Sequence, residues 1–443
     1  MKKVFLVCAI LMVWCMSCNK KNDYKKVFSN PLLFTYTEYE LNGVVMGNNF
    51  SPIVASRNYL YANVAAYEVI AAGYPDKYKS LAGQLRELEP LPAPGKNKDR
   101  INYEFASLLS FCKLGSIVTF PEGSMDKYVD SLKKLAKDHG MPSDVFNNSI
   151  AFADTISSAI QAWSKGDNYA ETRSMEKYTV NDDPSRWIPT PPAYTSALEP
   201  HWDLIRPLVL DSANQFMPPP PYKFDVKDTT SNYYKEVMLS KHVVENLTPE
   251  QKHIADFWDD NPFKLNVSGH VMFGSKKFSP PGHWMSIAGI AAKKANADFG
   301  TTVYACAITS IALYDSFIEC WAVKYKYNTV RPETVINKYF DADWRPHLQT
   351  PPFPEYTCGH STGSAAAAEV LTSVFGDNFA YTDSTELEFG IANRSYKSFR
   401  DAALENNKAR FYGGIHYQYS CEYANQCGTE VGDLIARRLK MKL

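Results

Sequence analysis

Proline is concentrated in one stretch of the chain, and this stretch constrains the fold more than any other feature of the sequence. Proline lacks a backbone N–H and clashes with the preceding helical turn, so closely spaced prolines exclude helix interiors and central strands. We therefore interpret residues 178–225 as an extended segment that crosses between two halves of the protein. Its prolines include Pro189, Pro191, Pro192, Pro200, Pro207 and 218–221.

Helical periodicity dominates the region before this segment. Ser51 followed by Pro52 is typical of an N-cap and first helical residue, and Gly73 marks a matching end. A second helix is predicted from Ser143 to about Gly166, because its apolar residues recur at three- and four-residue spacings. These residues are Phe146, Ile150, Ala153, Ile156, Ile160 and Trp163.

The region after the proline-rich segment is also predicted to be helical, with helices over residues 301–326, 361–376 and 386–408. The alternating patterns that are typical of strands are nearly absent. The expected fold class is therefore all-α, with two packed helical bundles. The first bundle would come from residues 31–177 and the second, which carries the site, from residues 226–443.

The composition is that of a globular protein without a general affinity for nucleic acid. Of the 443 residues, 45% are hydrophobic and 21% are charged, so the chain can bury a large core. Its formal net charge is −1. Binding to nucleic acid or to an anionic membrane surface through charge needs a marked basic excess, so neither is indicated. Any positive potential must be local.

The N-terminus has the pattern of an export signal. Lys2 and Lys3 precede an apolar run over residues 4–16 that is short for a membrane span. The Ser17-Cys18 step that follows resembles a bacterial lipoprotein cleavage site. This resemblance implies that Cys18 is lipidated and becomes the first residue of the mature chain.

On this interpretation residues 1–17 are a signal peptide and residues 18–30 a polar tether. The protein would be exported and lipid-anchored to a membrane of the cell envelope, in the periplasm or at the outer membrane. An uncleaved membrane anchor is the alternative. The Cys15-x-x-Cys18 spacing also matches a redox or zinc motif, but no second pair of ligands follows it.

Three clusters of chemically active residues lie in the last third of the chain. They are Trp321 with Lys324 and Arg331, the segment 354–361 with Cys358, Gly359 and His360, and Arg410 with His416. Two arginines, a lysine and two histidines form a large cationic group in a chain of net charge −1. Arginine forks match tetrahedral oxoanions and keep their charge when buried. The clusters therefore predict an oxoanion pocket.

Glycines in these clusters support the same prediction. Gly359 lies just before a helix that is expected to start near Ser361, which we take as its N-cap. Free N–H groups at a helix start favour an anion, and glycine lets the backbone approach closely. The Gly413-Gly414 pair allows a turn inside the third cluster. The G-x-S-x-G pattern around Ser361 also fits a nucleophile elbow, but the proline-rich segment 350–354 cannot be the buried strand that an elbow requires.

The spacing of the three clusters resembles the signature of the vanadium haloperoxidase / type 2 phosphatidic acid phosphatase superfamily. The resemblance covers about residues 178–443 and includes the flanking segments 281–284 and 412–416. It implies an all-α fold that holds vanadate, or phosphate in the same pocket. The implied oxoanion-binding residues are Lys324, Arg331, Cys358, Gly359 and Arg410.

The resemblance also implies roles for the remaining residues. His416 would be catalytic, either as the metal ligand of vanadate or as the nucleophile toward phosphorus, and His360 would be the catalytic acid and base. Trp321 and Phe353 match the aromatic residues of the halide site in the haloperoxidase branch. We expect an enzyme that oxidises halide with hydrogen peroxide. An acid phosphatase acting on phosphate esters and a non-catalytic oxoanion-binding lipoprotein are the alternatives.

Two residues depart from the family pattern. Cys358 replaces a serine, and a thiol is a weaker donor than a hydroxyl. Ser420 stands where the family usually has an aspartate that orients the imidazole of His416. Glu422 or Asp315 are the candidates to replace this carboxylate. We therefore expect weaker oxoanion binding and a less basic His416.

Two other polar residues need an explanation. His283, in the segment 281–284, is expected to have a structural role. Asp315 lies on an otherwise apolar helical stripe, where an unpaired carboxylate would be costly to bury. We expect an ionic partner for it, either Arg410 or another cation in a salt bridge between helices.

Overall fold

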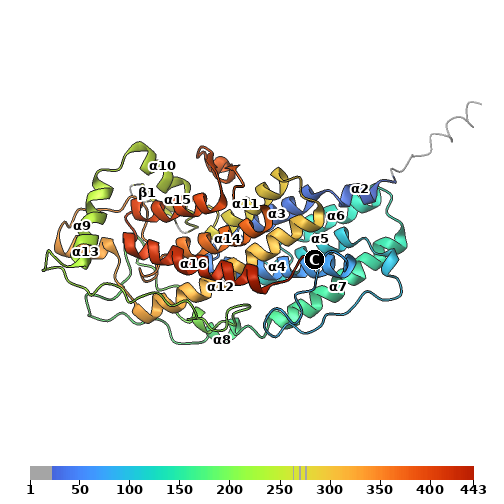
Figure 1. The fold of residues 1–443 in the computed structure, drawn as a ribbon, viewed down its shortest axis with the longest axis horizontal. Helices are drawn as coiled ribbons and strands as arrows, with labels where there is room; N and C mark the ends of the chain where they lie inside the picture. The colour runs from blue at the N-terminus through green and yellow to red at the C-terminus, as the bar shows by residue number, and fades with distance from the viewer. Residues whose placement is uncertain (1–21, 263, 269–270, 275–276) are drawn as a thin grey trace, which may run out of the picture.

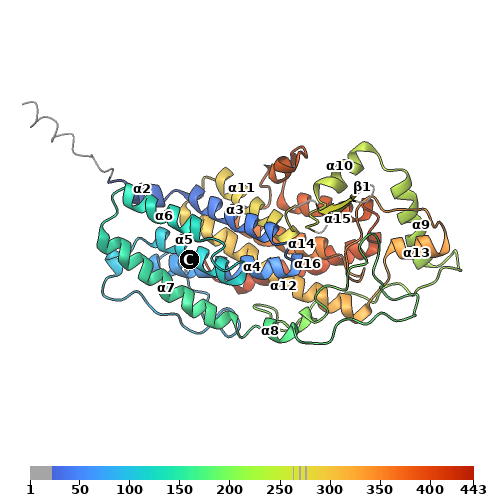
Figure 2. The same cartoon turned by 180° about the vertical axis from the view of Figure 1, so that it is seen from behind.

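Helices account for nearly all of the regular structure in the computed structural model, which describes residues 22–262, 264–268, 271–274 and 277–443. The predicted lipidation site, Cys18, lies outside these residues. The helices form an elongated body in which α5, α6 and α7 lie toward one end and α9, α10 and α13 toward the other (Figures 1 and 2). The all-α fold class predicted from the sequence is confirmed.

The first half is built around α4 (Pro52–Gly73), whose start follows the sequence signal. The side chain of Ser51 caps the helix by accepting a hydrogen bond from the N–H of Val54. α4 is buried over almost its whole length and packs against α5 and α7. The other elements of this half are α2 (Tyr24–Phe28), α3 (Pro31–Gly47), η1 (Lys98–Arg100), α5 (Tyr103–Val118), α6 (Asp126–Asp138), α7 (Ser143–Ser164) and α8 (Tyr169–Thr172).

The second half contains the remaining helices and two small antiparallel sheets, β1 with β2 and β3 with β4. Its helices are α9 (Asn232–Glu245), α10 (Pro249–Phe257), α11 (Pro280–Lys294), α12 (Phe299–Tyr327), α13 (Pro332–Tyr339), α14 (Gly359–Phe375), α15 (Phe399–Tyr412) and α16 (Gln418–Arg438). Its strands and 3-10 turn are β1 (Leu265–Ser268), β2 (Val271–Gly274), β3 (Tyr381–Asp383), β4 (Arg394–Tyr396) and η3 (Thr385–Phe389).

The long helix α12 joins the two halves. It packs against α4 of the first half and against α14 and α16 of the second, so that one continuous apolar core runs through both. α12 is long and apolar enough to cross a membrane, yet the most apolar window of this helix is entirely buried inside the protein. This is the environment of a core helix.

Residues 178–225 contain a single regular element, the 3-10 turn η2 (Trp202–Leu204). Asp315 of α12 fastens this segment to the core. Its fully buried carboxylate accepts three backbone hydrogen bonds of 2.7–3.0 Å, from the N–H groups of Leu208, Val209 and Leu210. The expectation that Asp315 pairs with Arg410 or another cation is therefore wrong, because amide groups satisfy its charge.

The helix predicted over residues 386–408 is wrong in its first half. The η3 turn ends at Gly390, whose φ of 77° lies in the left-handed region that terminates helical turns. Strand β4 follows and pairs with β3, which precedes η3, and α15 starts only at Phe399. Ser398 caps it by accepting a hydrogen bond from the N–H of Asp401.

Candidate active site

Buried side chains from five segments meet beside the start of α14. A direct contact links two of these segments, because Nη1 of Arg331 lies 3.0 Å from Nε2 of His416. Arg410 and His360 both bond with the backbone of Asp259, and the charge of Arg410 acts on the imidazole of His360, so these two groups lie in the same pocket. The contributing residues are Lys324 of α12, Arg331 before α13, the loop 354–358 with His360 at the start of α14, Arg410 of α15 and His416 before α16.

His416 is held in one tautomer by partners on both sides of its ring. Its Nδ1–H donates to Oε1 of Glu355 over 2.8 Å, and its Nε2 accepts a hydrogen bond from Arg331 over 3.0 Å. Because both partners are buried, the ring orientation is well determined. Nε2 is therefore the unprotonated nitrogen, and a metal or phosphorus atom that displaced the Arg331 hydrogen bond could bind its lone pair.

Glu355 is a functional residue that the sequence reasoning missed. Its carboxylate also accepts a hydrogen bond of 3.3 Å from the backbone N–H of Tyr417, so it fixes both the ring and the chain around His416. The two candidates, Glu422 and Asp315, do not orient His416. Glu422 bonds with Gln418, and Asp315 bonds with the crossing segment. The expectation that His416 lacks an orienting carboxylate is therefore wrong. The loop before α14 supplies this carboxylate, in place of a residue at position 420.

Lys324 fastens that loop. Its Nζ donates hydrogen bonds to the carbonyls of Pro354 at 2.9 Å, of Glu355 at 3.0 Å, and of Thr357. An ammonium group has three donors, and all three are used in this way. Lys324 therefore has no donor left for an anion in the pocket and attracts it only through its positive charge. Its hydrogen bonds also set the path of the loop that carries Glu355.

The pocket concentrates positive charge in a buried place. Lys324, Arg331 and Arg410 are at most 2% exposed. Glu355 is the carboxylate that acts on Lys324 and Arg331, and it is already bonded to His416. Burial lowers the pKa of Lys324 to about 8 and that of Arg331 to about 10. A bound anion would oppose both shifts, so the pocket is suited to a negatively charged ligand.

Unpartnered polar atoms identify the kind of ligand. Nη2 of Arg331, Nε of Arg410 and Nε2 of His360 are buried without a hydrogen-bond partner among the residues that the structure describes. Buried N–H groups are rarely left unpaired, because each costs about 1–3 kcal/mol when it lacks a partner. The two guanidinium donors come from different segments and fit the oxygens of a tetrahedral oxoanion such as vanadate or phosphate.

The start of α14 adds backbone donors to the pocket. The helix begins at Gly359 and not at Ser361, so Cys358 occupies the N-cap position and makes no side-chain cap. The expectation that Ser361 is the N-cap is therefore wrong. The N–H groups of the first turn have no partner within the helix. A Cβ at Gly359 would lie 3.2 Å from the ring of Trp321, so the backbone and this ring are close together.

Cys358 brings a thiol, packed against Cys421, into the pocket. Burial raises the pKa of Cys358, but the hydrogen bond with Cys421 and other polar neighbours outweigh burial and lower it well below its usual value. A thiol is a poorer neighbour for an oxoanion than a serine, because it donates a weaker hydrogen bond than a hydroxyl.

Two aromatic residues border the cations. The rings of Trp321 and Phe353 are 5.0 Å apart, and Nζ of Lys324 lies 5.1 Å from the centre of the Phe353 ring. The guanidinium of Arg331 is also 5.1 Å from this ring. The structure thus places both predicted halide-site residues beside the pocket, where an anion next to the cations would meet an apolar wall.

Arg410 and His360 are positioned by a segment that the sequence reasoning did not single out. Nη1 of Arg410 donates to the backbone carbonyls of Trp258 and Asp259 at 2.8 and 3.2 Å. The imidazole of His360 also hydrogen-bonds with the backbone of Asp259. Backbone acceptors leave no motif in a sequence, so only the fold shows this contact.

Comparisons with known proteins agree with this geometry. The model of the VCPO second helical-bundle domain matches residues 304–343 and 337–443. A search of curated proteins gave no match. A crystal structure described as the first bacterial vanadium-dependent iodoperoxidase superposes with a TM-score of 0.87 and is 45% identical, covering 93% of this chain and 97% of that one.

Two structures of a bacterial vanadium-dependent chloroperoxidase share the fold at lower identity. The holo form has a TM-score of 0.65 at 17% identity and the apo form 0.66 at 16%, each covering 88% of this chain and respectively 92% and 94% of the other. The 45% identity over nearly the full length of both chains decides the assignment. The chain belongs to the vanadium haloperoxidase family.

Proposed function

We propose that the protein oxidises halide ions with hydrogen peroxide, using vanadate bound to Nε2 of His416. The observation that carries this proposal is the set of unpartnered buried atoms near His416: the guanidinium donors of Arg331 and Arg410 and the Nε2 of His360. When bound, vanadate supplies the Lewis-acidic centre at which peroxide becomes able to oxidise a halide.

The residues of the chain have separate tasks in this proposal. Arg331 and Arg410 bind the oxoanion through Nη2 and Nε, and Lys324 adds charge. Glu355 holds the proton on Nδ1 of His416, so that Nε2 is unprotonated; its lone pair accepts from Arg331 here and would bind vanadate in place of that contact. His360 exchanges protons with the substrate through its unpartnered Nε2. Burial and the charge of Arg410 lower the pKa of His360 well below its usual value, so it is neutral and able to accept a proton.

The aromatic pair supports the choice of halide over phosphate ester. Trp321 and Phe353 cover the pocket beside Arg331 and Lys324, and this surface suits a weakly hydrated monovalent anion. Because the 45%-identical structure is described as an iodoperoxidase, iodide is the first halide to test.

Purified apo-protein, assayed with peroxide and iodide before and after addition of vanadate, tests the proposal. We expect iodide oxidation that requires added vanadate. The same Nε2 lone pair of His416 could instead attack phosphorus, so release of phosphate from a monoester, inhibited by vanadate, would favour an acid phosphatase. Binding of vanadate without either activity would leave a non-catalytic oxoanion-binding protein.

We also propose that the protein is exported and anchored in the cell envelope by a lipid on Cys18. The support is the sequence pattern of residues 1–18 alone. A Cys18→Ala variant should accumulate unprocessed and lose the membrane association of the wild type. Unchanged processing and fractionation would contradict the proposal.

A further inference from the structure

The segment 258–260, which follows α10, contacts the pocket through its backbone. The carbonyls of Trp258 and Asp259 accept the hydrogen bonds from Arg410, and the backbone of Asp259 bonds with His360. Two of the groups that face the oxoanion therefore take their orientation from two consecutive backbone units. A small change in the path of this segment would redirect both groups together.

Asp260 keeps this segment in an unusual conformation. Its φ is 41°, in the left-handed region, although it is fully buried and is not glycine. Such a conformation is unfavourable for a non-glycine residue and persists when other contacts hold it. The contact that holds it is a hydrogen bond of 2.9 Å, in which Nδ1–H of His283 donates to Oδ1 of Asp260.

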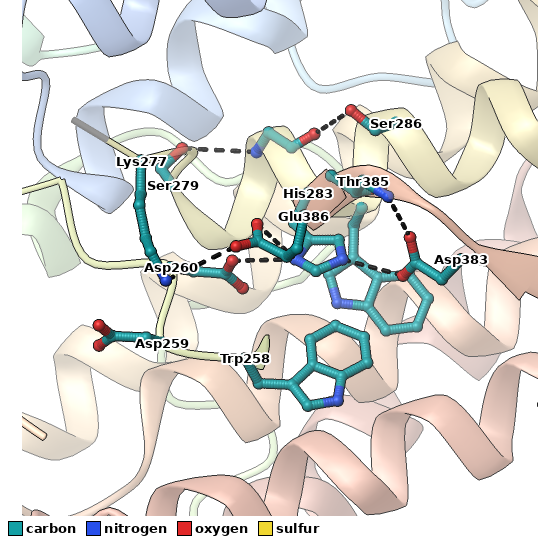
Figure 3. A network of polar contacts seen from close by, with 12 residues as sticks. Trp258, Asp259, Asp260, Lys277, Ser279, His283, Ser286, Asp383, Thr385 and Glu386 are labelled. Carbon is teal, nitrogen blue, oxygen red and sulfur yellow. Dashed lines mark hydrogen bonds and ion pairs between the residues drawn. The ribbon is translucent and has the colours of Figure 1, made fainter. Parts of the chain in front are cut away.

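His283 is itself firmly placed in the core (Figure 3). It lies in the first turn of α11, and its Nε2–H donates to Oδ2 of Asp383 over 2.9 Å. The indole of Trp258 stacks on the imidazole, with ring centres 4.6 Å apart and planes 19° apart. Burial alone would lower the pKa of His283, but Asp260 and Asp383 raise it well above its usual value, so the ring is a doubly bonded imidazolium.

The same group has atoms spaced as metal ligands, since ligand atoms of Asp260, His283 and Glu386 lie within 4.8 Å of one another. Positive charge is already present, however. Both nitrogens of His283 are bonded to carboxylates, and Nζ of Lys277 lies 3.6 Å from Oε2 of Glu386 (Figure 3). The arrangement is that of an internal anchor made of charged side chains.

We infer that His283 and Asp260 are positioning residues for the oxoanion pocket. His283, fixed in α11 by Asp383, holds Asp260 and the stacked Trp258. The segment 258–260 in turn aims Arg410 and His360 at the oxoanion. This inference rests on the proposed function. It means that His283 and Asp260, which lie outside the pocket, control the orientation of Arg410 and His360 within it.

Asp260→Asn and Asp383→Asn form a matched pair that tests the inference. Each change replaces a carboxylate that accepts a 2.9 Å hydrogen bond from the His283 imidazolium by a neutral amide. A merely structural role of His283 predicts equal effects of the two changes. A positioning role predicts a larger effect of Asp260→Asn on anion binding, because only Asp260 belongs to the segment that holds Arg410 and His360.

Calorimetric titration of the apo-proteins with vanadate, and separately with inorganic phosphate, gives the dissociation constants. We expect Asp260→Asn to weaken vanadate binding by about tenfold more than Asp383→Asn, at a similar loss of Tm. Hydrogen exchange should also rise in the segment 258–260 of Asp260→Asn and not in that of Asp383→Asn.

The outcomes separate this inference from the proposed function. Equal dissociation constants and equal exchange in the two variants would overturn the positioning role while leaving the function intact. Wild-type protein that binds neither anion would overturn the proposed function. In that case, exchange raised only in Asp260→Asn would still support the mechanical link from His283 to the segment, and unchanged exchange would refute it.

Discussion

Two buried charged clusters lie close together in the second half of the molecule, and their compositions are opposite. The oxoanion pocket has the cations Lys324, Arg331 and Arg410 around one carboxylate, Glu355, and its unpartnered atoms include the donors of both arginines. The His283 cluster has three carboxylates around two cations, and its unpartnered oxygens are acceptors. Its members are Asp260, Lys277, His283, Asp383 and Glu386.

The difference shows how the unpartnered polar atoms of each cluster are satisfied. Unpartnered donors can be satisfied only by an anion or another acceptor, so the pocket needs a ligand from outside. Unpartnered carboxylate oxygens can take a proton from water. Burial and the charge of Asp260 raise the pKa of Glu386 to about 8, which supplies that proton near neutral pH. One cluster therefore binds a ligand, and the other serves as an anchor.

Of the changes considered, His416→Ala should impair the ligand-binding pocket most, because it removes the atom that binds the oxoanion, while it leaves the His283 cluster intact. We expect loss of vanadate-dependent halide oxidation. Vanadate should bind at least about 100-fold more weakly, since loss of a ligand should exceed the 10–100-fold effect of losing a partner of a ligand. His242→Ala, at an exposed histidine, is the control for histidine removal and should retain both properties.

Glu355→Gln should weaken vanadate binding by about 10–100-fold, because an amide can accept the Nδ1–H of His416 without supplying the charge that makes Nε2 basic. Glu422→Gln, at an exposed residue, is the matched control. Titration of the apo-proteins measures the effect. If Glu355→Gln bound vanadate like the wild type, Glu355 would not be the orienting carboxylate.

Ser420→Asp is informative because Glu355 already orients His416. Ser420 is fully buried, so a new carboxylate there would be desolvated without an assigned partner. We expect a lower Tm and no gain in turnover. A clear increase in turnover would mean that Glu355 does not replace the family's usual aspartate in orienting the imidazole of His416.

Cys358→Ser should have a smaller and opposite effect. A hydroxyl donates to an oxoanion better than a thiol, so vanadate should bind more tightly, by up to about tenfold. Cys306→Ser, at a buried thiol of the main core, controls for the loss of a sulfur atom. Unchanged affinity in Cys358→Ser would place this side chain outside the contacts of the anion.

Glu386→Gln should have the smallest effect, seen only in stability. Folding raises the pKa of Glu386 from 4.5 to about 8, so the folded protein keeps a proton that the unfolded chain releases between these values. The wild type therefore loses stability as pH rises across this range, and the variant lacks this loss. We expect the Tm of Glu386→Gln, relative to the wild type, to increase from about pH 5 to about pH 8.5. A constant difference would contradict the proposed protonation.

The sequence by itself determined the parts of the protein that depend on local signals. The start of α4 is encoded by Ser51 and Pro52, which act within one helical turn. The residues that meet in the pocket were predictable because a fixed spacing on helices and tight turns, such as that of Arg410 and His416, restricts where a side chain can lie. Membership in the family also followed from such spacings.

Only the tertiary structure decided which groups become partners. Glu355 reaches His416 across 61 positions of sequence, and the donors to Asp315 lie more than 100 positions before it. The acceptors for Arg410 are backbone carbonyls, which any residue type provides. Hydrogen-bond partners are chosen by the path of loops and by the requirement that buried charges be satisfied. That requirement acts over the folded molecule, so local sequence patterns do not contain it.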